Sequence, residues 1–243
     1  MPIRALGCSS SSFTDLVYAD DTTLFATSSQ SAAESLSSFQ NAASVLGMHI
    51  SWPKTKVQNL GTGQPLSDVS VDAHHVECVD NFTYLGSVQS SDGYSRPDIR
   101  RRIALAASVM SSLSNIWRDQ RLSLSTKTRI YQTLVVSVLL YASETWTLLA
   151  ADVKTPEAFH MKCQQQILRI RWQDHVRNDE VAARTGLRTV MESIRRRRHL
   201  WARGENVTKH SSSPSTETIQ VEASVGRRPD RDWVHSSGHP RNR

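Results

Sequence analysis

The sequence predicts an α+β protein in which a β-rich N-terminal part precedes a mostly α-helical part. Two short β-prone runs at 16–18 and 22–26 flank the pair Asp20-Asp21, which predicts a hairpin with acidic residues at its tip. From Pro97 onward, apolar residues recur at spacings of three or four, the period of an amphipathic helix. This change of pattern places the boundary between the two parts at about residue 95.

The N-terminal part is expected to contain one helix besides its short strands. Apolar residues at 32, 36, 39, 43 and 46 follow helical spacing, and Gly47 stands where a helix commonly ends. Prolines and glycines between 53 and 65 then predict loops and short strands. The segment Phe-Thr-Tyr-Leu-Gly-Ser at 82–87 predicts a strand that ends in a turn.

The C-terminal part is predicted to be a series of helices. The first carries an apolar stripe from Ile99 to Trp117, and Ser125 is the expected N-cap of the second, which runs through Tyr141. A third helix is expected over about 159–170, a short one over 178–185 and a last one over about 189–201. Gly186 stands where the short helix should end.

Residues 206–243 are predicted to be a disordered basic tail. They are rich in serine, proline, arginine and glycine and contain few apolar residues. Hydrophobic residues make up 38% of the whole chain, below the roughly 45–50% of a typical globular domain, so part of the chain should lie outside any core.

Charge is distributed unevenly along the chain. Residues 1–94 contain 3 basic and 9 acidic side chains, a net charge of −6, whereas residues 95–243 contain 26 basic and 14 acidic ones, a net charge of +12. An acidic segment beside a basic one indicates metal binding next to polyanion binding. The alternative is that lysines and arginines merely solvate helix surfaces.

The remaining composition favours an intracellular protein, in the nucleus or the cytoplasm, and not a secreted one. Cys8, Cys78 and Cys163 are widely spaced and odd in number, so we expect reduced thiols and no disulfide framework or zinc site. The N-terminus has no apolar core typical of a signal peptide, and no apolar stretch approaches the roughly 18 residues of a membrane span.

The tetrapeptide Tyr18-Ala19-Asp20-Asp21 carries the clearest chemical signal. Polymerases join nucleotides with two metal ions, and Mg²⁺ prefers oxygen ligands such as carboxylates. Adjacent aspartates on a tight turn between strands would supply such ligands. An Asp-Asp pair by itself is weak support, because turns favour aspartate for local hydrogen bonding.

Several segments resemble, in order, the reverse transcriptases of non-LTR (LINE-type) retrotransposons. Y-A-D-D at 18–21 resembles motif C of these enzymes. The other matching segments are G-M-H-I-S at 47–51 with K-T-K at 54–56 (motif D), F-T-Y-L-G at 82–86 (motif E), K-T-R-I-Y at 127–131 and L-L-Y-A-S-E-T-W at 139–146 (thumb), and 167–186 (the basic helical region after the thumb).

The resemblance implies a domain organisation and a role for individual residues. Residues 1–94 would be a partial polymerase palm, 95–150 a helical thumb and 151–205 a basic helical region. Asp20 would bind the catalytic Mg²⁺ ions and Asp21 would support it. Lys54 and Lys56 would lie near the incoming nucleotide, unless they are ordinary solvated lysines.

The resemblance also indicates contacts with a template and primer of RNA and DNA. Tyr84 and Leu85 would form the primer grip, although both could equally be core residues of a hairpin. Basic helix surfaces would contact nucleic-acid phosphates, or serve only as solvated faces or as a nuclear-import signal. The residues concerned are Arg100, Arg101, Arg102, Arg118, Arg121, Arg195, Arg196, Arg197 and Arg198.

The match to the family is incomplete. Only nineteen residues precede Asp20, and Asp15, the one carboxylate among them, would lie about 17 Å away along the same strand. No segment of this sequence corresponds to the upstream aspartate of motif A, to motif B or to the fingers. We therefore expect a fragment of an RNA-directed DNA polymerase that is inactive alone. The alternatives are a non-catalytic nucleic-acid-binding module and a transposon relic without function.

Overall fold

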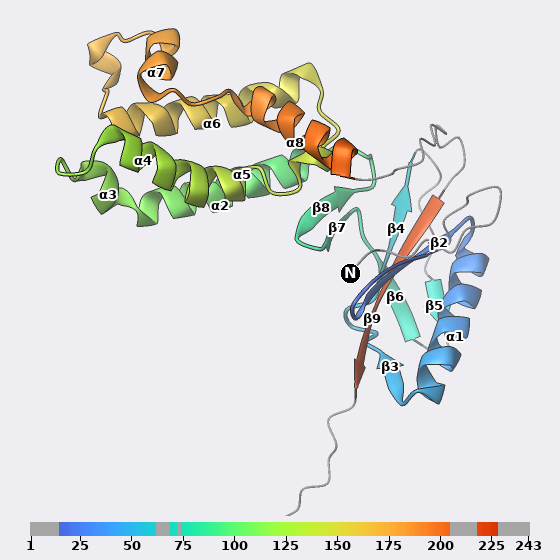
Figure 1. The fold of residues 1–243 in the computed structure, drawn as a ribbon. Helices are drawn as coiled ribbons and strands as arrows, with labels where there is room; N and C mark the ends of the chain where they lie inside the picture. Colours follow the sequence, from blue (N-terminus) through green and yellow to red (C-terminus); the bar gives the residue numbers. More distant parts are fainter. Residues whose placement is uncertain (1–14, 62–68, 72–73, 205–217, 228–243) are drawn as a thin grey trace, which may run out of the picture. The chain divides into compact units, whose positions relative to one another are not determined.

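The computed structural model describes residues 15–61, 69–71, 74–204 and, for the backbone alone, 218–227 (Figure 1). The fold is mixed α+β, as the sequence predicts, and the chain forms two compact units. The first comprises Met1–Asp80 with Ser215–Arg243, and the second comprises Asn81–Pro214. The units therefore divide between Asp80 and Asn81, so the hairpin that follows belongs with the helices.

The predicted acidic hairpin is confirmed. Strands β1 (Asp15–Tyr18) and β2 (Asp21–Ala26) pair antiparallel, with Tyr18 opposite Asp21, so that Ala19 and Asp20 form a two-residue turn. Asp15 pairs with Leu24 at the end of the hairpin opposite to the turn that contains Asp20. This agrees with the separation of the two aspartates expected along the strand.

Strand β9 (Thr218–Arg227) lies in the middle of the sheet of the first unit. It pairs antiparallel with β2 over six residues, with β4 (Lys56–Leu60) over five and with β3 (Met48–Ile50) over three. The prediction of a disordered tail is thus wrong for residues 218–227. Their sequence, T-I-Q-V-E-A-S-V-G-R, alternates polar and apolar residues, the pattern of a strand. The rest of the tail lies outside the described residues.

The remaining strands and one helix complete the first unit. The sheet runs in the order β1-β2-β9-β4-β6-β5, with β6 (His74–Cys78) parallel to β4 and antiparallel to β5 (Val69–Val71). Helix α1 (Ser29–Val45), in the region predicted, packs on this sheet. Its fully buried residues Ala32 and Leu36 belong to one core cluster with Val57 and Val76 of the strands. The Ser28 side chain accepts a hydrogen bond from the N–H of Ser31, which caps the helix start.

The second unit begins with the hairpin of β7 (Asn81–Tyr84) and β8 (Ser87–Ser90), and continues as helices. The α-helices are α2 (Arg96–Ser112), α3 (Ser114–Arg118), α4 (Leu124–Ile130), α5 (Ser137–Leu139), α6 (Ala150–Leu168), α7 (Asn178–Thr185) and α8 (Val190–Gly204). The short helix α7 and its end at Gly186 are confirmed.

Several details differ from the sequence prediction. Helix α6 begins at Ala150, nine residues before the start expected for the third helix, and the first expected helix is divided into α2 and α3. The N-cap of α4 is Ser123, whose side chain accepts from the N–H of Thr126, so Ser125 lies inside the helix. The predicted second helix is also interrupted, because a π-helical segment, η1 (Tyr131–Val136), separates α4 from α5. Helical periodicity locates an apolar stripe but does not distinguish α from π hydrogen bonding within it.

The helices pack around one apolar core that includes Trp117, Tyr131, Leu139 and Ile194. Two polar side chains of this core are hydrogen-bonded: Tyr131 Oη lies 2.7 Å from His160 Nδ1, and Trp117 Nε1 donates to the carbonyl of Met110. Burial raises the pKa of the Cys163 thiol to about 11, so it stays protonated at neutral pH. Cys78 and Cys163 are free thiols, and Cys8 lies outside the described residues.

Candidate functional site

The Asp20-Asp21 pair stands at the tip of the β1–β2 hairpin. Ala19 has a φ of 53°, the left-handed conformation that two-residue hairpin turns require at their first position. Asp20 is exposed in the turn, and Asp21 is half-buried as the first residue of β2. The hairpin therefore presents the two aspartates at its tip, as the sequence predicts.

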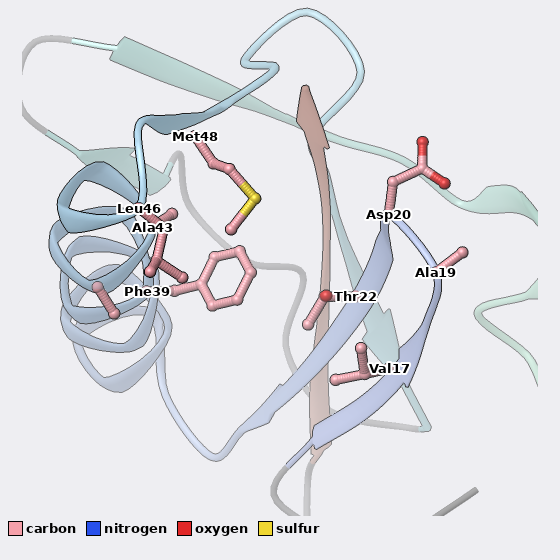
Figure 2. A pocket seen from close by; sticks show the side chains of 9 residues that line it. Val17, Ala19, Asp20, Thr22, Phe39, Ala43, Leu46 and Met48 are labelled. Atoms are coloured by element: carbon pink, nitrogen blue, oxygen red, sulfur yellow. The ribbon is translucent and has the colours of Figure 1, made fainter. Parts of the chain in front are cut away.

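A hollow of about 310 Å³ lies beside this turn, between the hairpin and α1. Its lining is almost entirely apolar and includes Val17, Phe39 and Met48 (Figure 2). Asp20 contributes to the rim, but its carboxylate points away from Phe39 and Met48 (Figure 2). No lysine or arginine lines the hollow, so its chemistry does not suit a triphosphate.

The described residues do not complete a metal centre around Asp20. Within the ranges that the structure describes, no three histidine, cysteine or acidic side chains cluster closely enough to hold a metal ion. Asp20 and Asp21 are sequence neighbours at the end of a strand, where successive side chains point to different sides. Two-metal chemistry needs ions roughly 3.5–4 Å apart, held by convergent carboxylates. The residues present do not fit that pair of ions by themselves.

The two lysines proposed to meet a nucleotide differ in their surroundings. Lys54 is exposed in the turn before β4, whereas Lys56 Nζ lies 2.5 Å from Glu77 Oε2. The hydrogen bond from Lys56 holds the pKa of the Glu77 carboxyl below its usual value. Because β9 separates β4 from β2, Lys56 lies two strands from Asp21, roughly 12 Å away by strand spacing and register.

The F-T-Y-L-G segment forms the tip of the second hairpin. Leu85 and Gly86 connect β7 to β8 with φ values of 46° and 79°, as in a turn with both central residues left-handed. Leucine adopts this conformation only at a cost in free energy, so the surrounding contacts must enforce it. Leu85 is also partly exposed, whereas core packing was the alternative interpretation.

Three side chains of the helices hold this turn through its backbone carbonyls. Tyr141 Oη donates to the carbonyl of Leu85 at 2.9 Å, and Arg101 Nη1 donates to that of Gly86 at 2.9 Å. Arg102 Nη2 donates to the same Gly86 oxygen, and its guanidinium lies 4.3 Å from the centre of the Tyr141 ring. We call Tyr141, Arg101 and Arg102 the hairpin clamp.

The clamp changes how the arginines of α2 are interpreted. Arg102 is only 7% exposed, and burial lowers the pKa of its guanidinium while Asp98 opposes that shift. Its contacts are those of a structural residue. Arg101 is exposed although it binds Gly86, and Arg100 is exposed without an ion pair to any carboxylate in the described ranges. Arg100 and Arg101 thus remain available to a phosphate.

Asp98 was not singled out from the sequence, yet it joins the hairpin to the helices. It is completely buried, and its carboxylate accepts from the N–H of Val88 at 2.9 Å and from Trp146 Nε1 at 2.8 Å. Arg102 Nε lies 3.7 Å from the same carboxylate. An acidic residue in the first turn of a helix was the only signal in the sequence, and such residues are ordinarily exposed.

The arginine quartet of α8 divides into two pairs. Arg195 and Arg196 are exposed and form no ion pair with a carboxylate in the described part of the chain. Arg197 and Arg198 donate hydrogen bonds to backbone carbonyls of the segment after η1. Arg197 Nη1 donates to the carbonyl of Leu140 at 2.7 Å. Arg198 Nε donates to the carbonyl of Glu144 at 3.2 Å, and Arg198 Nη2 donates to that of Trp146.

Of the helices that the structure describes, none is long and apolar enough to cross a membrane.

Comparisons with known proteins find a distant similarity to a transposon-derived protein. No family model matches the chain, and no solved structure matches it. The chain is similar to a Caenorhabditis elegans protein described as uncharacterized and transposon-derived, with 23% identity over 201 residues, covering 78% of this chain and 70% of that protein. The similarity is consistent with a transposon-related origin for this chain.

Proposed function

We propose that this chain is part of a retrotransposon reverse transcriptase and that, by itself, it binds nucleic acid without extending a primer. The observation that carries the proposal is the exposed Y-A-D-D turn at a hairpin tip, followed in family order by the clamped F-T-Y-L-G hairpin and basic helices. The similarity to a transposon-derived protein supports the same origin.

The clamp supports a primer-grip role for the second hairpin. A residue that contacts a primer end must be positioned rigidly. A strained backbone conformation persists only where several contacts with neighbouring residues hold it in place. Leu85 meets both conditions, because its turn is fixed through its own carbonyl and that of Gly86. Tyr84 and Leu85 would then meet a strand held by the exposed arginines of α2 and α8.

We expect no primer extension by the purified chain with Mg²⁺ or Mn²⁺, because Asp20 and Asp21 have no third ligand among the described residues. The measurement is gel-based extension of a primed RNA template, with an intact reverse transcriptase as positive control. Extension that disappears in Asp20→Ala would contradict the prediction and would mean that another carboxylate completes the site.

Phosphate contacts give affinity for RNA and DNA alike, with a steep dependence on salt. If about six phosphates are neutralised, affinity should fall by ~10³ between 50 and 200 mM salt. Filter-binding titrations at several salt concentrations measure the slope. Absence of binding at 50 mM salt would contradict both the proposed function and the alternative of a non-catalytic nucleic-acid-binding module. The interpretation that would then remain is a transposon relic without function.

The two arginine pairs of α8 provide a matched comparison. Arg195→Ala with Arg196→Ala should weaken binding to RNA and DNA alike and leave the melting temperature unchanged. Arg197→Ala with Arg198→Ala removes the same charge but also the hydrogen bonds to backbone carbonyls, so the melting temperature should fall. Equal effects of both pairs on stability would contradict the structural role of the second pair.

A further inference from the structure

A pocket of about 560 Å³ lies between α3 and the C-terminal part of α6, within the second unit. Its size is within the roughly 300–1,000 Å³ of ordinary ligand sites. Four basic side chains line it: Arg118 from α3, Lys162 from α6, and Arg169 and Arg171 just beyond α6. Of these four, only Arg118 was singled out by residue from the sequence, and the other three lie in the region 151–205 that the sequence predicts to be basic and helical.

The charged side chains that line the pocket are all basic, and the Asp174 carboxylate accepts a hydrogen bond from the backbone N–H of one lining residue, Arg171, at 2.7 Å. No carboxylate lines it, and the four basic side chains form no ion pair among the described residues. This sets them apart from Arg121, Arg177 and Arg184, each of which is paired with an acidic neighbour. Four like charges around one hollow repel one another, so the site should gain stability from an anion.

The backbone at Arg169 shows a second unusual feature. Arg169 ends α6 with a φ of 60°, and the N–H groups of Arg169 and Ile170 donate to the carbonyls of Gln166 and Gln165. This is the Schellman arrangement, in which glycine is the usual residue at the left-handed position. An arginine there is strained, and strained residues concentrate at functional sites.

Helix capping alone does not account for the cluster. Basic residues near a helix C-terminus interact favourably with its dipole, but that end carries only about half a negative charge, and the effect is confined to the last turn. Lys162 is more than a turn before the end of α6, and Arg118 belongs to another helix. The four cations therefore exceed what the dipole can compensate.

An exposed aromatic ring follows the pocket directly in sequence. Trp172, next to Arg171, is 82% exposed, an unusual state for a tryptophan. Aromatic rings beside cationic grooves are the combination with which proteins bind single-stranded nucleic acid, because bases stack on the rings while cations contact phosphates. A duplex offers the phosphates but keeps its bases stacked internally.

We propose that this pocket binds backbone phosphates of a single-stranded nucleic acid, and that Trp172 stacks on an unpaired base of the same strand. The inference rests on the proposed nucleic-acid binding of this chain and assigns it a specific site. Arg118, Lys162, Arg169 and Arg171 supply the positive charge, and Trp172 supplies the preference for unpaired bases.

The test uses the full chain with two labelled probes, a 20-nucleotide oligouridine and a 20-base-pair RNA duplex. Lys162→Gln with Arg171→Gln should weaken binding of both probes at 100 mM salt, by roughly eightfold for each phosphate that is no longer neutralised, and should reduce the salt slope. Trp172→Ala should weaken binding of oligouridine by about fivefold or more and leave duplex binding unchanged, whereas Trp172→Phe retains binding.

Arg169→Gly separates function from folding. Glycine adopts the left-handed conformation without strain, so the melting temperature should be equal or higher, while the affinity for oligouridine falls. Arg177→Gln with Arg184→Gln is the matched control, because it removes two positive charges that are already paired outside the pocket. The control should bind both probes nearly as the unaltered chain does.

The outcomes distinguish this proposal from the general one. If the unaltered chain binds with a steep salt dependence but the pocket variants bind as well as the control, the pocket proposal is overturned and the proposed function stands. If Trp172→Ala weakens duplex and oligouridine binding equally, stacking is overturned. If the unaltered chain binds neither probe at 50 mM salt, both proposals are overturned.

Discussion

Replacing Asp98 with alanine is expected to destabilise the second unit by about 3–5 kcal/mol, the usual cost of removing one partner of a buried charge pair. The substitution leaves Arg102 buried without its carboxylate, and it leaves Val88 N–H and Trp146 Nε1 without their acceptor. Each unsatisfied buried group is itself costly. Urea unfolding followed by tryptophan fluorescence measures the loss of stability.

Two further variants test the cause of that destabilisation. Asp98→Asn preserves the shape but offers one acceptor oxygen in place of two, so its destabilisation should be smaller than that of Asp98→Ala. Asp179→Ala removes an exposed carboxylate paired with Arg177, and should cost within about 1 kcal/mol. If Asp98→Ala costs no more than Asp179→Ala, the buried network does not join the hairpin to the helices.

Truncation of the chain after Glu205 is expected to disrupt the first unit and spare the second. The truncation removes β9, the strand that pairs with β2, β3 and β4. Without it, β1 and β2 form an isolated hairpin, which is marginal in water, and β4 loses one of its two neighbours. Hydrogen exchange measured by mass spectrometry should show reduced protection in β2 and β4 and unchanged protection in α2 and α6.

A shorter truncation is the matched control for this experiment. A chain that ends at Arg227 keeps the whole of β9 and should retain the protection of β2. A synthetic peptide of residues 216–229, added to the chain that ends at Glu205, should restore part of that protection by strand addition. Full protection of β2 in the chain lacking β9 would mean that this strand does not support the sheet.

The local elements were predictable because their signals lie within short stretches of sequence. The acidic hairpin, helix α1 with Gly47 after it, and helix α7 with Gly186 each combine a periodic pattern with a residue that favours a turn or a helix end. The exposed position of Asp20 followed from the same local pattern. The Y-A-D-D hairpin was therefore located correctly without any tertiary information.

The roles of the arginines could not be read from the sequence in the same way. Arg195, Arg196, Arg197 and Arg198 are identical in type and adjacent, yet only the second pair binds backbone carbonyls. An arginine can donate equally to a phosphate or to a carbonyl oxygen. Which of these it meets depends on the helix face and on the segment packed against it, and only the folded chain provides that segment.

Sequence alone was enough to predict the α+β class, the acidic hairpin tip, the bounds of α1 and α7 to within two residues, and the basic character of the helical part, because propensity, periodicity and charge are local properties. The folded chain was needed to show that residues 218–227 complete a sheet begun about 200 residues earlier. It was also needed to show that Asp98 and the hairpin clamp hold the hairpin of β7 and β8, and that Arg118, Lys162 and Arg171 line one pocket. The physical reason is that strand pairing, burial of a charge and convergence of cations depend on which distant segments meet, and no pattern within one segment encodes its partner.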